Sequence, residues 1–511
     1  MTSACADESR AALRRMVYRI LITVSAGLML GRIFAVDSID MEGLERFRLE
    51  QIRGELKAKR DRLEQQGVAE NRIRRELVRT EAELRRRAQL RRPFLSANDR
   101  SRWATLRALV EPEMRVPGAP YAIDRVLNEP GWDTIDLVKH DGHLYSSKPT
   151  LLPTLLAAEY WVIYKVTGKT LGEEPYAIGR LMLVTVNVVP LVFSFWLLSR
   201  LVERLGTSDW GRIFMMAVAT LGTFLTTFAV VLNNHVLAAV TTLVCLYALV
   251  VILLDGDRRL RWFVLAGLAA ALTATNELPA LSFLAAVLVG LLWKAPKETL
   301  LGFVPGALVI AAGSLTTNWI AHGTFSPPYA HRSKTDPADN WYEFTYERNG
   351  RLYHSYWTNP VGVDQGEPSL AKYVVHALVG HHGVFSLTPV WILSFIGMGL
   401  WLWRPPDGRL RELALLVAGV TLVCLVFYLF VLGERDRNYG GMSSGFRWMF
   451  WFAPMWLLTM LPALDRMACR KWRRGTALAM LLVSVLSASY PTWNPWTHPW
   501  LWDFLRYLGV G

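Results

Sequence analysis

Long apolar runs are the feature that most constrains what this chain can fold into. Stretches of roughly 17–25 apolar residues recur along most of its 511 residues, and this is the length that crosses a bilayer core as a helix. Without such runs, a chain of this length would be expected to form several soluble domains. We instead predict an all-α polytopic membrane protein with about eleven transmembrane helices. The predicted spans lie near residues 16–36, 177–199, 212–232, 236–254, 262–276, 278–293, 299–320, 384–403, 412–432, 448–464 and 475–490.

Lys and Arg residues cluster in every second predicted loop. Arg14 and Arg15 precede the first span, Arg258 and Arg259 lie between the fourth and the fifth, and Arg473 precedes the last. Cytoplasmic loops carry an excess of these residues. We therefore expect a multi-pass protein of the plasma (inner) membrane, with a cytoplasmic N-terminus and an outer C-terminus. No small-residue cleavage site follows the first span, which we expect to remain as an anchor.

Charge and loop lengths divide the chain further. The net charge of +13 is explained by the loop bias and by one basic insert, and gives no indication of nucleic-acid binding. That insert repeats leucine and isoleucine at helical spacing on both sides of Gly67, which predicts an antiparallel helical hairpin. We interpret it either as a solvated structural insert or as a surface for a protein partner. The segments are an N-terminal anchor helix (1–41), the inserted hairpin (42–92), a first outer loop with interfacial helices and catalytic motifs (93–170), transmembrane helices (171–321), an outer loop with an aromatic hairpin (322–383), and C-terminal transmembrane helices with a Trp-rich tail (384–511).

Two stretches of the outer loops carry local signals. Asn349-Gly350 stands between aromatic-rich flanks, which predicts a small β-hairpin, the only β-structure that we expect. Residues 151–166 are apolar but short, and form either a helix lying in the interface or an extra span. We favour the interfacial helix, because an extra span would break the alternation of basic loops.

The polar side chains suited to chemistry gather in the predicted outer loops. NDRSRW (98–103) carries Asp99 beside Arg102, and HDGHLYSSKP (140–149) carries Lys148. The chain has neither a GxxxxGK[ST] phosphate loop nor a GxSxG nucleophile elbow, and its four cysteines show no zinc or disulfide pattern. A carboxylate with separated cations fits transfer of a sugar from a polyprenyl phosphate to a hydroxyl. The carboxylate would act as general base, and the cations would stabilise the leaving phosphate.

Five motifs carry a resemblance to a known family. They are NDRSRWATLRALV (98–110), HDGHLYSSKPTLLPTLLA (140–157), LNNHVLAA (232–239), GLAAALTATNELPALSF (267–283) and YGGMSSGFRW (439–448). In this order they resemble the GT-C glycosyltransferases, in particular bacterial relatives of protein O-mannosyltransferases and of the aminoarabinose transferase that acts on lipid A. The likeness covers most of the chain outside the insert. It implies a GT-C-like fold and an inverting single displacement, from a polyprenyl-phosphate sugar to an acceptor lipid, glycan or protein at the outer membrane face.

The resemblance also implies roles for single residues. Asp99 matches the family's catalytic acidic residue, while Lys148 and Arg447 match positions that contact the donor phosphate, to which we add Arg102. Ser147 stands where some members carry an acidic residue implicated in metal binding, so the resemblance leaves a divalent metal cofactor open. Membrane lipids are further expected partners. Additional candidates for substrate binding are Asp141, His143, Tyr145, Asn234, His235 and Tyr439.

Each assignment has a structural alternative. Asp99 is also placed to cap the helix that begins near it, Lys148 to snorkel to headgroups, and Arg447 to anchor the interface. For the whole chain, the alternative is a membrane transporter or lipid flippase without transferase chemistry, which would carry ionisable residues and repeats within its spans. A scaffold whose hairpin recruits a partner is the third interpretation.

Overall fold

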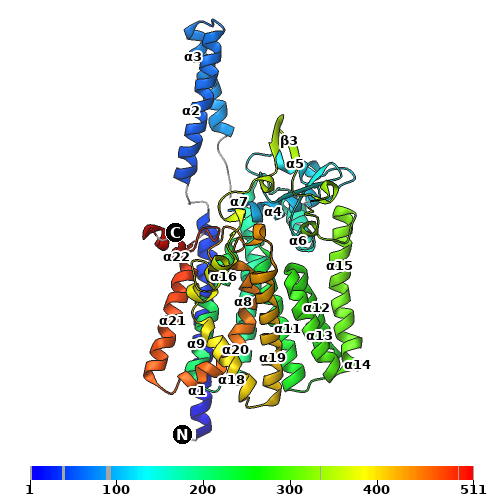
Figure 1. The fold of residues 1–511 in the computed structure, drawn as a ribbon, viewed down its shortest axis with the longest axis vertical. Helices are drawn as coiled ribbons and strands as arrows, with labels where there is room; N and C mark the ends of the chain where they lie inside the picture. The colour runs from blue at the N-terminus through cyan, green and yellow to red at the C-terminus, as the bar shows by residue number, and fades with distance from the viewer. Residues whose placement is uncertain (1–2, 37–40, 88–93, 334, 493, 510–511) are drawn as a thin grey trace.

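The structure is a computed structural model that describes residues 3–36, 41–87, 94–333, 335–492 and 494–509. It is mostly helical, with two small two-stranded sheets. Figure 1 shows a bundle of long helices whose one end carries α4 (Ala97–Val110) and α6 (Leu151–Thr167). We call this the α4 end. The bundle starts at the opposite end, where α1 (Ser3–Ala35) begins, and α22 (Trp500–Tyr507) lies towards the α4 end.

Helices occupy all of the predicted spans. Within the described residues, six helices are long and apolar enough to cross a membrane, while α12 (Leu260–Asn276), α13 (Leu281–Lys294) and α18 (Trp391–Trp403) lie in shorter apolar helices. The total of about eleven crossings therefore stays a prediction. The six candidates are Glu8–Ala35, Pro175–Leu205, Asp209–Val230, Asn234–Leu254, Pro296–His322 and Gly408–Val431.

Several of these helices expose apolar side chains along one face. Leu308 and Val309 of α15 (Val304–His322) and Leu422 of α19 (Gly408–Val426) are each more than half exposed. Soluble proteins rarely expose apolar faces of this extent. Long apolar helices with such faces are those of a membrane protein.

Glycine lets neighbouring helices approach closely. A Cβ atom on Gly267 of α12 would lie 2.1 Å from the carbonyl oxygen of Phe303, and one on Gly397 of α18 would lie 2.0 Å from that of Thr459 in α20 (Ala453–Met467). Small residues serve this purpose in membrane helix interfaces, where packing rather than water drives association. These contacts fix the helices whose ends carry the polar residues discussed below.

The predicted helical insert is present as α2 (Met41–Gln65) and α3 (Glu70–Arg87), which run antiparallel and extend beyond the α4 end (Figure 1). Ile52 and Ile73 are buried, while most of the charged residues remain exposed. The short turn between the helices lies where Gly67 interrupts the hydrophobic repeat. Residues 88–92 of the predicted insert lie outside the described residues, as does Trp493 of the predicted Trp-rich tail.

The predicted β-hairpin is confirmed. Strands β3 (Thr345–Arg348) and β4 (Arg351–His354) pair antiparallel around Asn349 and Gly350, whose φ angles are +51° and +72°. Positive φ at both central residues is typical of a type I′ turn, which suits the twist of a two-residue hairpin.

A second hairpin corrects the expectation that β-structure occurs in one place. Strands β1 (Leu137–His140) and β2 (His143–Ser146) pair antiparallel around Asp141 and Gly142, with φ angles of +48° and +82°. Asp-Gly is as strong a hairpin signal as Asn-Gly. The residues on both sides of this turn are largely polar, so they lack the alternation of apolar and polar residues that usually marks a strand. This hairpin also sets the position of Lys148, which follows β2 by two residues.

Candidate functional site

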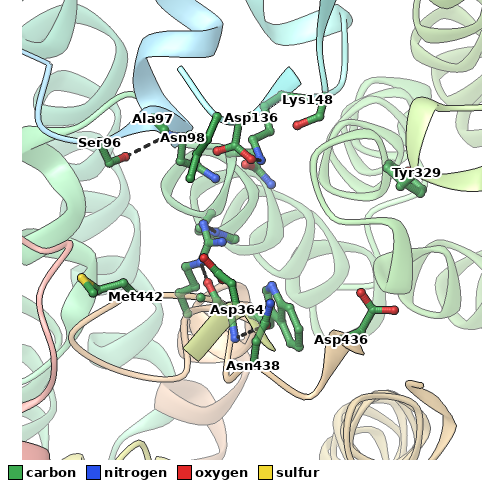
Figure 2. A pocket seen from close by; sticks show the side chains of 18 of the residues that line it. Ser96, Ala97, Asn98, Asp136, Lys148, Tyr329, Asp364, Asp436, Asn438 and Met442 are labelled. Atoms are coloured by element: carbon green, nitrogen blue, oxygen red, sulfur yellow. Dashed lines mark hydrogen bonds and ion pairs between the residues drawn. The ribbon is translucent and has the colours of Figure 1, made fainter. Parts of the chain in front are cut away.

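A cavity of about 510 Å³ lies at the α4 end of the bundle. Figure 2 shows Asp136 and Lys148 on one side of it, with Asp364 and Asn438 on another. The walls are therefore built from segments far apart in the sequence. They include the start of α4, the two arms that flank the β1–β2 hairpin, the start of α11 (Asn234–Leu254), the turn between α12 and α13, and loops around residues 360–364 and 435–448.

The first turn of α4 is capped by its own side chains. The Ser96 hydroxyl accepts hydrogen bonds from the backbone N–H groups of Asn98 and Asp99 at 3.1 and 3.3 Å. The Asp99 carboxylate accepts one from the Ser96 backbone N–H at 2.9 Å, which completes a capping box. Burial raises the pKa of Asp99 to about 6. Asp99 is not among the residues that line the cavity, and its carboxylate serves the helix cap, the alternative considered above. It nevertheless lies close enough to Arg102 for that cation to lower its pKa electrostatically.

Arg102 lies one turn further along α4 and reaches the cavity. Its Nη1 donates to the backbone and side-chain oxygens of Asn98 at 2.6 Å each, and its Nη2 donates to Oδ1 of Asn234 at 2.5 Å. The Asn234 amide in turn donates to the Glu277 carboxylate at 3.0 Å. Arg102 is only 2% exposed, and burial lowers its pKa to about 10. The guanidinium therefore remains charged at neutral pH and is held mainly by uncharged groups.

His235 and Arg447 continue this network across the cavity. Nδ1 of His235 contacts the Glu277 carboxylate, and its Nε2 lies 3.4 Å from Nη1 of Arg447. The Arg447 guanidinium lies 5.0 Å from the centre of the Trp496 ring, and its Nε donates to the Gly440 carbonyl. Gly440 has φ of +90°, and a Cβ atom there would lie 3.0 Å from Cγ of Arg447. A glycine at this bend thus makes room for the arginine.

Lys148 forms an ion pair with Asp136, the Nζ–Oδ1 distance being 2.8 Å. Asp136 precedes β1 and Lys148 follows β2, so the pairing of Leu137 with Ser146 brings the two side chains to the same edge of the hairpin. Burial lowers the pKa of Lys148 to about 8, although the Asp136 carboxylate works in the opposite direction. The ammonium is therefore poised to lose its proton just above neutral pH.

Five cationic and four acidic side chains line the cavity, but their pairing is uneven. In the part of the chain that the structure describes, Arg102 and Arg447 form no ion pair with a carboxylate. Burying a charge without a counterion costs several kcal/mol, roughly, even after relaxation. Such a site is suited to an anion supplied by a ligand. The paired cations are Lys148 with Asp136 at 2.8 Å, Arg332 with Asp436 at 2.9 Å and Arg435 with Glu343 at 2.8 Å.

The structure brings together only part of the sequence-predicted site. Arg102, Lys148, Arg447, Asn234 and His235 all line the cavity.

Four other predicted residues do not line it. Asp141 forms the turn of the β1–β2 hairpin, and its side chain is 84% exposed. His143 lies 3.4 Å from the Asp124 carboxylate, and the Tyr145 ring stacks on His140. Tyr439 stacks on His382 in a histidine-rich cluster. These contacts are structural, and they hold the loops around the cavity.

None of the four cavity carboxylates, Asp136, Glu277, Asp364 and Asp436, is among the sequence-predicted site residues. Asp136 would follow from the Asp-Gly hairpin, whose register places it beside the segment that leads into Lys148. Glu277 stands in the GLAAALTATNELPALSF motif (267–283), but nothing in that motif indicates its contacts with Asn234 and His235. Asp364 reaches the cavity through tertiary structure alone, and the sequence holds no local signal for it.

A second cavity adjoins the first and shares nine of its lining residues, among them Glu277, Arg332 and Trp448. It adds the charged Glu343 and Glu434, and the apolar Phe427 and Leu432 from the end of the helical segment that begins with α19. Leu278 is 47% exposed. The polar cavity is therefore continuous with an apolar surface of the helix bundle.

Among the described residues, no group of three or more His, Cys, Asp or Glu side chains is arranged to hold a metal ion. The acidic and histidine residues of the cavity instead bond to cations, amides and hydroxyls. Neither protein-family models nor curated proteins match the chain.

Proposed function

We propose that this chain is a membrane-embedded glycosyltransferase of GT-C type, which transfers a sugar from a polyprenyl phosphate to a hydroxyl of an acceptor lipid, glycan or protein. The observation that carries the proposal is a pair of guanidiniums without carboxylate partners among the described residues, the buried Arg102 and the half-buried Arg447, in one cavity with Lys148. The resemblance of the surrounding motifs to that family adds to it. The reaction would be a single displacement with inversion.

A phosphate is the anion that best fits this arrangement. Guanidinium groups bind phosphate oxygens through two parallel N–H donors, and charge-assisted hydrogen bonds of this kind are about twice as strong as neutral ones. Arg102 and Arg447 approach the cavity from different elements and are joined by the chain Asn234–Glu277–His235. Because their positions are fixed before a ligand arrives, they would stabilise charge on a leaving phosphate with little reorganisation.

The apolar side chains in the second cavity support a lipid-linked donor rather than a soluble nucleotide sugar. Leu278, Phe427 and Leu432 line that cavity, and Trp448 stands between the two cavities. A prenyl chain would gain about 25 cal/mol for each Å² of apolar surface removed from water. One ligand with a charged head and a prenyl tail would therefore use both cavities.

The location of the cavity favours transfer over transport. Its lining comes from loops and from the ends of helices, as the start of α4 and of α11 illustrate. A transporter or flippase would be expected to place ionisable groups near the midplane of its spans. We accordingly propose an enzyme of the plasma (inner) membrane with about eleven crossings, a cytoplasmic N-terminus and a cavity that faces outwards.

Transfer of labelled sugar from synthetic polyprenyl-phosphate donors to a panel of acceptors tests this proposal. We expect transfer with at least one donor, and at least tenfold less with Arg447→Gln, because charge-assisted hydrogen bonds to a phosphate contribute roughly 1.5–3 kcal/mol each. Glu347→Gln, an exposed change in strand β3, is the matched control and should transfer at the wild-type rate. Failure of every donor with folded wild-type protein would contradict the proposal, and transport of the same lipids by that protein would favour a flippase.

A further inference from the structure

We infer that Asp364 is the general base that accepts the proton of the attacking hydroxyl. The inference rests on the proposed function, and it names a residue that the sequence motifs do not indicate. It follows from comparing the carboxylates that line the cavity, since Asp99 is not one of them. A catalytic base needs a carboxylate that faces the substrate and is free to take a proton.

Three of the four cavity carboxylates already have charged or hydrogen-bonded partners that a proton would disrupt. Asp136 is paired with Lys148, and Asp436 with Arg332. Glu277 accepts from the Asn234 amide and contacts His235, so it links the two arginines. Protonating Asp136 or Glu277 would weaken a contact that positions a proposed phosphate ligand, and protonating Asp436 would weaken its ion pair with Arg332.

Asp364 differs from them in its partner. Its Oδ2 accepts a hydrogen bond from the Tyr356 hydroxyl at 3.0 Å, and among the described residues it forms no ion pair. Figure 2 shows it at the cavity, across from Asp136 and Lys148. Asp364 thus lies across the cavity from Lys148 and close to the segment that carries Arg447.

The backbone around Asp364 holds this position. The residue lies in the short helical turn η10 (Gly362–Gln365), and Gly366 directly follows it with φ of +84°. A Cβ atom on Gly366 would lie 2.1 Å from the Glu434 carbonyl oxygen, so the loop packs against the segment that leads to Arg447. A Cβ atom on Gly441 would lie 3.3 Å from Oδ1 of Asp364. The base and the phosphate-binding arginine are thus fixed relative to each other.

In the proposed step, the acceptor oxygen forms a bond to the anomeric carbon while the bond from that carbon to the phosphate oxygen breaks. The electron pair of the broken bond leaves on the polyprenyl phosphate, beside Arg102, Lys148 and Arg447. The hydroxyl proton passes to the Asp364 carboxylate and later to water. Burial raises the pKa of Asp364, which makes the carboxylate a stronger proton acceptor than one in free solution.

The variant Asp364→Asn tests the inference, with Asp136→Asn as the contrasting cavity variant and Glu347→Gln as the control outside the site. We expect Asp364→Asn to lower the single-turnover transfer rate roughly 10²–10⁴-fold, the usual range for a general base, while its affinity for polyprenyl phosphate stays within threefold of wild type. Asp136→Asn should instead weaken donor binding, because Lys148 loses its partner. Retention of more than a third of the wild-type rate in folded Asp364→Asn would overturn the inference.

A second variant keeps the test decisive if Asp364→Asn does not fold. The Tyr356 hydroxyl stabilises the charged carboxylate and so lowers its pKa. Tyr356→Phe should therefore raise that pKa and move the acidic limb of the rate–pH profile to higher pH. An acidic limb at the wild-type position would contradict the role of Asp364. If wild-type protein transfers no sugar from any donor, the proposed function fails as well, whereas transfer that survives both variants overturns the base alone.

Discussion

Two buried arginines on the same helix, α4, have opposite environments. Arg102 and Arg107 are each 2% exposed. Arg107 makes an ion pair with Glu111 at 2.8 Å, and the Tyr160 hydroxyl donates to the same carboxylate at 2.5 Å. Arg102 donates to the oxygens of Asn98 and Asn234 and has no carboxylate partner among the described residues. One charge is compensated within the fold and the other is not.

We propose that this difference separates a structural charge from a ligand-binding one. Arg107 and Glu111 are four residues apart on one helix, a spacing that lets them pair locally. Neutral groups hold the Arg102 guanidinium in position, at the edge of a cavity that also contains Arg447 and Lys148. The charge of this guanidinium has no carboxylate counterion in the described part of the fold, and an anionic ligand bound in the cavity would supply one. Exposure alone, being equal for the two arginines, carries none of this information.

The largest effect is expected from Arg107→Gln. It leaves the Glu111 carboxylate buried without its cation, which typically costs 3–5 kcal/mol, roughly, of folding free energy. The thermal unfolding of detergent-solubilised protein should shift strongly downwards, or the protein should not accumulate. The double variant Arg107→Gln/Glu111→Gln should recover part of the loss. If the single and double variants were equally stable, the charges of Arg107 and Glu111 would not compensate each other, and the contrast with Arg102 would fail.

A smaller effect of a different kind is expected from Arg102→Gln. Removing this cation deletes a charge-assisted contact to the phosphate, worth roughly 1.5–3 kcal/mol, or about 10- to 100-fold in affinity. The unfolding temperature should stay at or above that of wild type, because no carboxylate is left without a partner. Titration with polyprenyl phosphate measures the first quantity and thermal unfolding the second. A large loss of stability with unchanged affinity would show that Arg102 is structural.

The pH dependence of donor binding tests whether the Lys148 ammonium contacts the phosphate. Its folded-state pKa lies near 8, below the ordinary value for lysine, so the ammonium is present below that pH and lost above it. Affinity of the free protein for polyprenyl phosphate should therefore fall as pH rises through about 8. Lys148→Arg should remove most of this fall, since a guanidinium keeps its charge. Affinity that stays constant in wild type between about pH 7 and about pH 9, on either side of that pKa, would contradict a contact with phosphate.

The smallest effect is expected from Asp99→Ala. It removes one half of the capping box, and losses of helix caps cost about 0.5–2 kcal/mol. Ser96→Ala, which removes the other half, should lower the unfolding temperature by a similar amount. Both variants should transfer sugar at near the wild-type rate once folded. If Asp99→Ala lost transfer activity while its stability stayed unchanged, Asp99 and not Asp364 would be the general base.

Local signals in the sequence predict more of the fold than of the site. Asn349-Gly350 predicts its hairpin because both residues adopt positive φ readily, and the Asp141-Gly142 turn is missed only because polar residues flank it. The cations of the site are also foreseen, since Lys148 and Arg447 stand in recognisable motifs. Asp364 is not foreseen, because it meets the other cavity residues through long-range packing at Gly366 and not through any spacing along the chain.

Binding of polyprenyl phosphate by wild-type protein and by the double variant Arg102→Gln/Arg447→Gln, compared with binding of the uncharged polyprenol, tests the central claim most directly. Titration calorimetry in one detergent and at one pH would measure all affinities. We predict that wild-type protein binds the phosphate at least tenfold more tightly than the alcohol, since each charge-assisted contact contributes roughly 1.5–3 kcal/mol. The double variant should bind the two lipids equally. Equal binding of phosphate and alcohol by wild-type protein, or a preference for phosphate that survives in the folded double variant, would contradict the account.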